Sequence, residues 1–245
     1  MIIGINGKIG SGKDTIGKII QYLTANEEVK QVTTLEEWLD SDDLNGRDFN
    51  WKIKKFAGKL KQIASLLTGI DVKKFEDQEF KKSLLGDEWG TVKENPLNSI
   101  PVFEDVQFNH LMSVRELLQK LGTEAMRDGL HTNVWVNALF ADYKAKWVPT
   151  GDAIEEDEVS LEKEYPNWII TDMRFPNELE AIELRESITI RVVRPDMHSL
   201  QAMVPTHASE TALDDAEFDY EIINDGSIED LIEKVKEILI KEQII

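Results

Sequence analysis

Residues 7–15, with the sequence GKIGSGKDT, constrain this chain more than any other stretch. They follow residues 1–6, an apolar segment that predicts a short strand, and they precede apolar residues at the i, i+3, i+4, i+7 spacing of an amphipathic helix. Gly7 and Gly12 are separated by four residues and followed by Lys13, which completes the phosphate-loop pattern GxxxxGK. Backbone N–H groups, the helix dipole and the lysine of such a loop converge on phosphate. The alternative is a glycine-rich turn that only joins a strand to a helix.

The residue after the loop lysine departs from the general pattern. Phosphate loops usually have Ser or Thr there as a Mg²⁺ ligand, but this chain has Asp14 followed by Thr15. A carboxylate is a harder and more anionic magnesium ligand than a hydroxyl. We therefore expect Asp14 to hold Mg²⁺, directly or through water.

The composition limits the classes of protein that this loop can serve. The chain has 245 residues, 41% of them hydrophobic, enough for one large α/β domain. Its net charge of −19 argues against duplex nucleic acid or an anionic membrane as the main partner, and the lack of cysteine excludes disulfides and cysteine metal sites. The first strand leaves no room for a signal peptide and no apolar run approaches a membrane span, so we expect a soluble intracellular protein.

Two acidic stretches are expected to be exposed insertions in a single domain that spans residues 1–245. Residues 27–50 contain clustered carboxylates and turn formers, and residues 149–166 contain consecutive acidic residues. A metal site in the first stretch is the alternative to a solvated surface.

A second strand-to-helix unit follows the first insertion. Residues 51–56 predict a short strand and residues 57–67 a helix. Three lysines in this strand, Lys52, Lys54 and Lys55, either help to hold an anionic substrate or are ordinary surface lysines. Spacing favours neither alternative.

Periodicity predicts the remaining elements. We expect helices at 71–83, 113–121, 134–147, 176–184 and 228–239, strands at 168–172, 187–193 and 218–223, and a long loop at 86–110. Ser227 and Asp230 are the expected N-terminal cap of the last helix. Strands that alternate with helices indicate an α/β protein with a largely parallel sheet flanked by helices.

Two predicted helices carry side chains whose roles stay open. Arg115 and Gln119 lie four residues apart on one helix face, before a Gly122-Thr123 turn expected to end the helix. That face either binds a phosphate and a base edge or is a solvated side with a glycine cap. Trp135 either stacks on a base or packs in the core.

Charged residues gather where the strand at 168–172 ends. Asp172 is its last residue, and Arg174 and Glu178 follow around a helix start at Pro176. Phosphate-loop proteins place a second carboxylate beside their magnesium and phosphates in this way, at the edge where open α/β sheets bind ligands. The alternative is a charged turn with an Arg174–Glu178 ion pair.

An irregular stretch at about 195–217 lies between two predicted strands, where nucleotide kinases carry a lid. Arg194 precedes it and is a candidate for an arginine that closes over the phosphates, since lid closure also excludes water. His207 and Glu210 are expected to shape the lid, because two further metal ligands are not evident beside them.

Several stretches together resemble the bacteriophage deoxynucleoside monophosphate kinases over nearly the whole chain. They are Ser11–Thr15, Arg115–Gln119 with Leu121–Glu124, Asn133–Trp135, Thr171–Glu178 and His207–Glu210. The Asp14 variant is what this family's loop looks like, and the DxRFPNE and HxSE stretches are more specific than the loop.

The resemblance implies a nucleoside monophosphate kinase-like fold and Mg²⁺-dependent transfer of the γ-phosphoryl group of ATP to a deoxynucleoside 5′-monophosphate. The implied ATP site is Gly10, Ser11, Gly12, Lys13, Asp14 and Thr15, with Lys13, Asp14 and Arg194 catalytic. The implied monophosphate site is Lys8, Arg115, Gln119, Gly122, Thr123, Trp135, Asp172, Arg174 and Glu178.

The resemblance also implies roles within these sites. Lys8 and Arg115 would neutralise phosphate, and Trp135 would pack on the base. Asp172 and Glu178 would orient Arg174 or bind sugar and base, and Asp14 could approach the acceptor oxygen as a base. Ile9 follows Lys8 where a second basic residue would be useful, so one donor expected near the acceptor is missing.

Two other functions stay open from the sequence. A dephospho-coenzyme A kinase-like enzyme has a similar loop, although Asp14 and the DxRFPNE stretch argue against it. A phosphate-loop ATPase or switch would need large partner surfaces. For the kinase we expect a small-molecule monophosphate as partner and no stable nucleic acid or membrane, with a homodimer left open. We expect a cytoplasmic location, in the host cell if the chain is phage-encoded.

Overall fold

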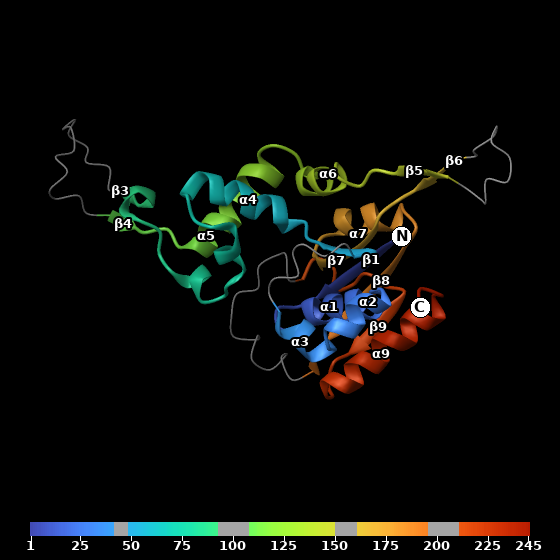
Figure 1. Ribbon diagram of the computed structural model, residues 1–245. Helices are drawn as coiled ribbons and strands as arrows, with labels where there is room; N and C mark the ends of the chain where they lie inside the picture. The colour runs from blue at the N-terminus through green and yellow to red at the C-terminus, as the bar shows by residue number, and fades with distance from the viewer. Residues whose placement is uncertain (42–48, 93–107, 150–160, 196–210) are drawn as a thin grey trace, which may run out of the picture. The chain divides into compact units, whose positions relative to one another are not determined.

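The computed structural model describes residues 1–41, 49–92, 108–149, 161–195 and 211–245 (Figure 1). The chain forms two compact units, one made of residues 1–56 and 136–245 and the other of residues 57–135. Each unit has its own hydrophobic core. The single domain expected over residues 1–245 stays a prediction.

The first unit is built on a five-stranded parallel sheet with the order β2-β7-β1-β8-β9. Its strands are β1 (Ile2–Gly7), β2 (Trp51–Lys54), β7 (Asn167–Met173), β8 (Ser187–Val193) and β9 (Tyr220–Ile223). Strands covered on both faces carry continuous apolar runs, which is why β1, β7 and β8 could be predicted. The sheet confirms the α/β class, and its order brings the carboxyl ends of β2, β7 and β1 side by side.

Helices cover both faces of this sheet (Figure 1). The helices of this unit are α1 (Lys13–Leu23), α2 (Glu27–Val32), α3 (Leu35–Asp40), α6 (Val134–Phe140, which begins in the second unit), α7 (Pro176–Glu183) and α9 (Ile228–Lys241). α1 and α9 pack on one face, where Ile16 and Ile20 meet Leu231 and Val235 in one apolar cluster. α7 lies on the other face (Figure 1). The predicted cap of the last helix is confirmed, because Ser227 and Asp230 form a capping box.

Residues 27–40 form two short helices rather than the exposed connection expected from their acidic sequence. Trp38 of α3 is fully buried and packs edge-on against Tyr22 of α1 and against Phe49. One aromatic side chain can bury 150–250 Å². A single Trp among acidic residues therefore fixes α3 to α1, although the surrounding composition is that of a surface loop.

The helix predicted over 134–147 ends early. After Phe140 of α6 the N–H groups of Asp142 and Tyr143 bond three residues back, which tightens and closes the last turn. The chain then forms β5 (Lys146–Pro149), paired antiparallel with β6 (Leu161–Glu164). Pairing with a distant segment therefore overrides the local helical spacing.

The second unit is a small assembly of short elements. It contains α4 (Ala57–Thr68), 3₁₀ turns at Val72–Glu76, Phe80–Lys82 and Asp87–Trp89, the antiparallel pair β3 (Thr91–Val92) and β4 (Phe108–His110), α5 (Val114–Gln119) and a π-helical segment Lys120–Asp128. Its core contains Ala64, Phe75, Leu85, Val114 and Leu117. The long loop expected at 86–110 thus has short strands near both of its ends.

Two predicted features of this unit are wrong. The helix expected at 71–83 is a pair of 3₁₀ turns, because the side chains of Asp71 and Asp77 accept backbone N–H groups and interrupt helical bonding. The helix expected to end at Gly122 continues with π-helical bonds, in which the Gly129 N–H reaches the Glu124 carbonyl at 3.0 Å.

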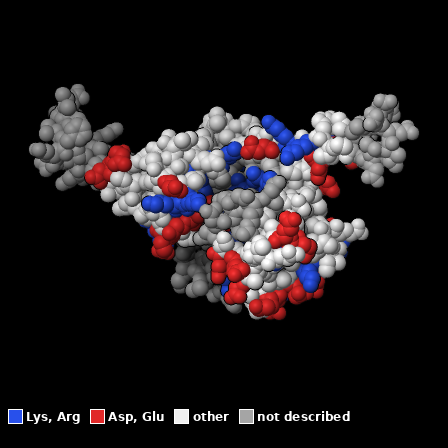
Figure 2. Space-filling model, viewed as in Figure 1, with Lys and Arg blue, Asp and Glu red and all other residues white. Residues whose placement is uncertain are grey.

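The surface of the molecule is rich in carboxylates. Figure 2 shows several groups of Asp and Glu residues on the visible face, with groups of Lys and Arg between them, in line with the net charge of −19. None of the helices in the described ranges is both long enough and apolar enough to span a membrane.

Candidate active site

The phosphate loop lies between β1 and α1, at the carboxyl edge of the sheet. Gly10 and Gly12 have φ angles of 79° and 98°, a left-handed conformation that glycine adopts without steric cost. The Ser11 N–H donates to the Lys8 carbonyl at 3.1 Å, which closes the turn. α1 then begins at Lys13, so the loop combines converging N–H groups with the positive end of a helix dipole.

Two loop side chains are buried. Lys13 is 7% exposed, and its Nζ donates to the Lys8 carbonyl at 3.2 Å, which holds the ammonium group at the loop. Ser11 is 3% exposed, and its Oγ has no hydrogen-bond partner among the described residues. A buried hydroxyl without a partner costs about 1–3 kcal/mol. Both side chains are therefore polar groups that lie inside the loop rather than on the surface.

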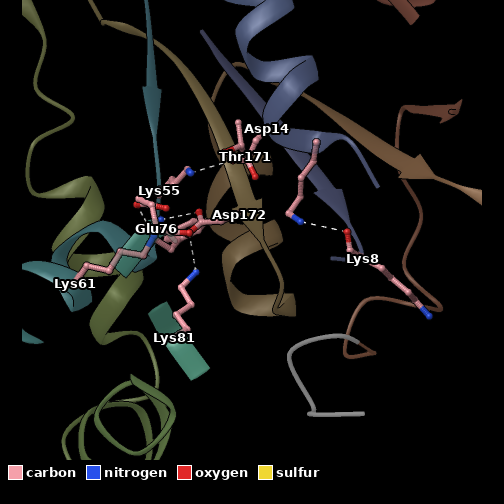
Figure 3. A network of polar contacts seen from close by, with 10 residues as sticks. Lys8, Asp14, Lys55, Lys61, Glu76, Lys81, Thr171 and Asp172 are labelled. Atoms are coloured by element: carbon pink, nitrogen blue, oxygen red, sulfur yellow. Dashed lines mark hydrogen bonds and ion pairs between the residues drawn. The ribbon is translucent and has the colours of Figure 1, made fainter. Parts of the chain in front are cut away.

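Asp14, in the first turn of α1, contacts side chains from two neighbouring strands. Its Oδ1 accepts a hydrogen bond from the Thr171 hydroxyl on β7 at 2.9 Å and lies 3.0 Å from Nζ of Lys55, just after β2. Figure 3 shows these three side chains pointing toward one another. Desolvation raises the pKa of Asp14, but Lys55, Thr171 and Lys13 together lower it by more, so the pKa lies below its usual value of 3.8. Asp14 is therefore ionised at neutral pH.

α1 approaches β7 closely at Gly17. A Cβ at this position would lie 2.5 Å from Cγ2 of Thr171, which is shorter than real Cβ contacts. Thr171 is fully buried and has little room to move. Because Gly17 has no side chain, α1 can lie near enough to β7 for Asp14, one turn earlier, to reach the Thr171 hydroxyl.

The carboxylates of Asp172, near the end of β7, and Glu178, in α7, accept hydrogen bonds from backbone N–H groups. Oδ1 of Asp172 accepts from the Phe56 N–H at 2.7 Å, which joins the end of β2 to the end of β7. Glu178 is 3% exposed, and its Oε2 accepts from the N–H groups of Arg174 at 2.8 Å and Phe175 at 3.1 Å. These bonds satisfy N–H groups at the start of α7. Both predicted ligand residues thus have structural partners that spacing did not reveal.

Lys8 and Arg194 also lie at the carboxyl ends of strands in the first unit. Nζ of Lys8 is 3.4 Å from Oδ2 of Asp214 in a partly exposed ion pair. The turn that carries Asp214 is fixed by Arg191 of β8, which donates to backbone carbonyls within residues 213–216. Arg194 follows β8 directly and is exposed.

The other predicted monophosphate residues belong to the second unit. Arg115 and Gln119 lie on α5, where Nη2 of Arg115 is 3.4 Å from Oε1 of Gln78 and Gln119 is exposed. Thr123 is partly exposed in the π-helical segment. Arg115 and Gln119 lie on a helix as their spacing predicted, whereas Thr123 lies in the helical segment that continues it rather than in a turn.

Trp135 is fixed against Gly122. The indole N–H donates to the Gly122 carbonyl at 2.8 Å, and the side chain is 5% exposed. A Cβ at Gly122 would lie 3.0 Å from Cδ2 of Leu60 on α4, so a larger residue would crowd this packing. The buried indole favours the packing alternative for Trp135 over base stacking.

Among the residues that sequence reasoning omitted and that contact the predicted site are Thr171, Asp214 and Asn224. Thr171 had a local signal, because it precedes Asp172 on a strand whose side chains alternate between faces. Asp214 and Asn224 had none, since both reach the loop from distant sequence. Two of the three lysines whose role the sequence left open have different surroundings. Lys55, just after β2, contacts Asp14, whereas Nζ of Lys54 on β2 lies 5.3 Å from the Trp168 ring centre.

Some predicted features lie outside the described residues. They are His207, Glu210, most of the lid expected at about 195–217, and residues 150–160 of the second acidic stretch.

The residues at Asp14 fit a magnesium ion. An ionised carboxylate beside a Thr hydroxyl provides the hard oxygen ligands that Mg²⁺ prefers. In the described part of the chain no group of three or more His, Cys, Asp and Glu side chains could hold a metal. Nucleotide-associated Mg²⁺ does not require such a group, because one or two carboxylates, phosphates and water complete its shell.

A glycine loop with a buried lysine at the carboxyl edge of a parallel sheet defines a phosphate-loop α/β protein. The family model for deoxynucleotide monophosphate kinase matches residues 1–235. The chain therefore belongs to the deoxynucleotide monophosphate kinase family, which confirms the resemblance seen in its motifs.

Three phage proteins are similar to the chain. Deoxynucleotide monophosphate kinase of Enterobacteria phage T4 is 29% identical over 163 residues, 59% of this chain and 60% of the relative. Deoxynucleoside-5'-monophosphate kinase of Escherichia phage T5 is 23% identical over 252 residues, 91% and 89% of the two chains. Deoxynucleotide monophosphate kinase of Escherichia phage RB69 is 30% identical over 131 residues, 54% and 46%. The match thus spans 60% of the T4 relative and most of the T5 relative.

Proposed function

We propose that the chain transfers the γ-phosphoryl group of ATP to deoxynucleoside 5′-monophosphates, giving ADP and the diphosphates. Family membership over residues 1–235 supports a monophosphate kinase, and the names of the phage relatives support a deoxynucleotide acceptor. The structural observation that carries the proposal is a phosphate loop in which Lys13 adjoins an ionised Asp14.

In this proposal Gly10–Thr15 bind the triphosphate of ATP. The loop N–H groups neutralise phosphate oxygens, and Lys13 stabilises charge on the transferring group. Arg194 adds a second positive charge, and closure of the segment after it excludes water. Asp14 would hold Mg²⁺, whose charge, when bound, offsets that of the β- and γ-phosphate oxygens.

The reaction needs positioning more than covalent help. An oxygen of the acceptor phosphate forms a bond to the γ-phosphorus while the bond to the β,γ-bridging oxygen breaks, and ADP leaves with that electron pair. A phosphate monoester is largely ionised at neutral pH, because its second pKa is about 6. Asp14, with its lowered pKa, is a weak base, so it is better suited to bind a cation than to accept a proton.

The residues proposed for the monophosphate are Lys8, Arg115, Gln119, Gly122, Thr123, Trp135, Asp172, Arg174 and Glu178. Lys8 and Arg115 supply positive charge for its phosphate. The bond from the Arg174 N–H to Glu178 supports an orienting role for Glu178 rather than direct contact with the sugar or base. Trp135, held by Gly122, is proposed to shape the site through packing.

We infer that the partners are small molecules, without a stable nucleic acid or membrane partner. A cytoplasmic location in the host cell follows if the chain, like its relatives, is encoded by a phage. A homodimer is a further proposal that light scattering at micromolar concentration can test.

The second candidate function is ATP hydrolysis by a switch protein, which the phosphate loop alone would also permit. It differs in one measurable respect, because a switch releases ADP without an acceptor. The dephospho-coenzyme A kinase alternative is disfavoured by the family match over residues 1–235.

A coupled assay of ADP release tests the proposal. Purified chain, ATP and Mg²⁺ are mixed with each deoxynucleoside monophosphate in turn, with dephospho-coenzyme A and no acceptor as parallel controls. We expect ADP release that depends on at least one deoxynucleoside monophosphate. Release without acceptor would favour the ATPase, and release only with dephospho-coenzyme A would favour the other kinase.

A further inference from the structure

A residue from the far end of the chain contacts the phosphate loop. Nδ2 of Asn224, at the end of β9, donates to the Ser11 carbonyl oxygen at 2.8 Å, across 213 residues of sequence. The Ser11 carbonyl belongs to the peptide bond that joins Ser11 to Gly12, immediately before Lys13. The contact therefore acts on the backbone of the loop at its junction with α1.

Asn224 is itself held on two sides. Its backbone N–H donates to the Val193 carbonyl at the end of β8, at 2.7 Å. From α9, Nζ of Lys234 donates to the Ile223 carbonyl at 2.6 Å and pairs with Asp225 at 3.0 Å. The turn after β9 is thus attached to a neighbouring strand and a helix, so the side-chain amide is presented in one place.

The loop fits Asn224 only with glycine at position 12. A Cβ on Gly12 would lie 2.5 Å from Nδ2 of Asn224, and the φ angle of 98° is one that other residues rarely adopt. The close approach of Asn224 to Gly12 and its hydrogen bond to Ser11 therefore depend on each other.

This hydrogen bond also fixes the direction of an N–H group. In a trans peptide the C=O and N–H point in opposite directions, so holding the Ser11 carbonyl toward Asn224 turns the Gly12 N–H the other way. A hydrogen bond to the carbonyl polarises the peptide and makes its N–H a stronger donor. The hydrogen bond from Asn224 therefore fixes the direction of the Gly12 N–H, away from Asn224, before any ligand is bound.

We propose that Asn224 is a positioning residue for ATP: it holds the Ser11–Gly12 peptide so that the Gly12 N–H binds the triphosphate. It acts through the loop and touches no substrate. The inference rests on the proposed function only in assigning ATP to this loop.

The test compares three variants of the full chain. Asn224→Ala removes the contact, Asn224→Asp keeps the shape but replaces the donor with a carboxylate, and Glu221→Ala, at an exposed position of β9, is the control. Calorimetry measures the Kd for ATP without acceptor. One lost hydrogen bond corresponds to roughly three- to tenfold weaker binding. We expect that loss for Asn224→Ala, a larger one for Asn224→Asp, and less than a twofold change for Glu221→Ala.

Steady-state kinetics and unfolding separate positioning from general damage. We expect the KM for ATP to rise with the Kd while the KM for the monophosphate stays unchanged, and the thermal midpoint of Asn224→Asp to stay near that of the parent. Unchanged ATP binding in both Asn224 variants, or an equal loss in Glu221→Ala, would overturn the inference. A parent chain that binds ATP but phosphorylates no monophosphate would refute the proposed function alone, and one that binds no ATP would overturn both.

Discussion

Lys55 and Asp14 form an ion pair in which Nζ lies 3.0 Å from Oδ1, although they belong to different strand-to-helix units of the chain. Lys55 follows β2 and Asp14 begins α1, and β7 lies between β2 and β1 in the sheet. Thr171 on β7 donates to the same carboxylate oxygen (Figure 3). Asp14 is therefore already ionised and oriented by groups from two strands.

Lys55→Met should raise the pKa of Asp14. The lysine contributes both charge and a hydrogen bond that lower this pKa, whereas burial alone raises it. A carbon-detected NMR titration of the Asp14 carboxyl measures the change. Lys52→Met, at an exposed position of β2, is the control and should leave the titration unchanged.

The same pair predicts a pH dependence of stability. The folded pKa of Asp14 is depressed, so its contribution is present above the usual pKa of 3.8 and disappears as the pH falls through the folded pKa. The free energies of unfolding of the parent and Lys55→Met should therefore differ at pH 6 and converge only as the pH falls through the folded pKa of Asp14, which lies below 3.8. A difference that stays constant across this range would show that Lys55 acts through packing alone.

Lys13→Ala should abolish turnover without unfolding the chain. Removing a group that stabilises charge on the transferring phosphoryl typically lowers the rate by about 10² to 10³-fold. ADP release and the thermal midpoint are measured together, with Lys236→Ala on α9 as an exposed control. Retained activity in Lys13→Ala would remove the loop lysine from the mechanism.

Gly17→Ala should destabilise the protein, although this change stabilises most helices by about 1 kcal/mol. The added Cβ would lie 2.5 Å from Cγ2 of Thr171, and overpacking of this kind costs roughly 1–3 kcal/mol. In Thr171→Ser the hydroxyl remains but Cγ2 is gone, so Gly17→Ala should cost less there. Urea unfolding of the parent, both single variants and the double variant measures the coupling, and additive costs would contradict the close contact.

Trp38→Ala should lower the free energy of unfolding by about 3–5 kcal/mol, because the side chain is fully buried against Tyr22 and Phe49. Trp38→Phe should cost much less. It keeps most of the aromatic packing and removes the indole Nε1, a buried atom with no hydrogen-bond partner among the described residues. Denaturant unfolding compares the two, and equal costs would show that the full indole volume is needed.

The parts of the fold that could be predicted are those that depend on the spacing of apolar residues close together in the sequence. The apolar runs of β1, β7 and β8 and the helical periodicity of α1 and α9 are local, and the burial seen in the structure follows them. Prediction failed where a nearby side chain accepted backbone N–H groups in place of helical bonding, or where a distant segment paired with the chain. Asp71 and Asp77 divide the expected helix at 71–83 into turns. The helix expected at 134–147 ends early, and Lys146–Pro149 instead pair antiparallel with residues 161–164.

The sequence by itself determined the chemistry available to this protein: a glycine loop, a lysine, an aspartate in place of the usual hydroxyl, and a strand that ends in a second carboxylate. Only the tertiary structure decided which side chains from elsewhere in the sequence contact these residues. Thr171 reaches Asp14 from 157 residues away and Asn224 reaches Ser11 from 213 residues away. The physical reason is that parallel strands become neighbours through long crossovers and shared burial of apolar faces. The spacing of residues along the chain does not reveal the order of the strands in the sheet.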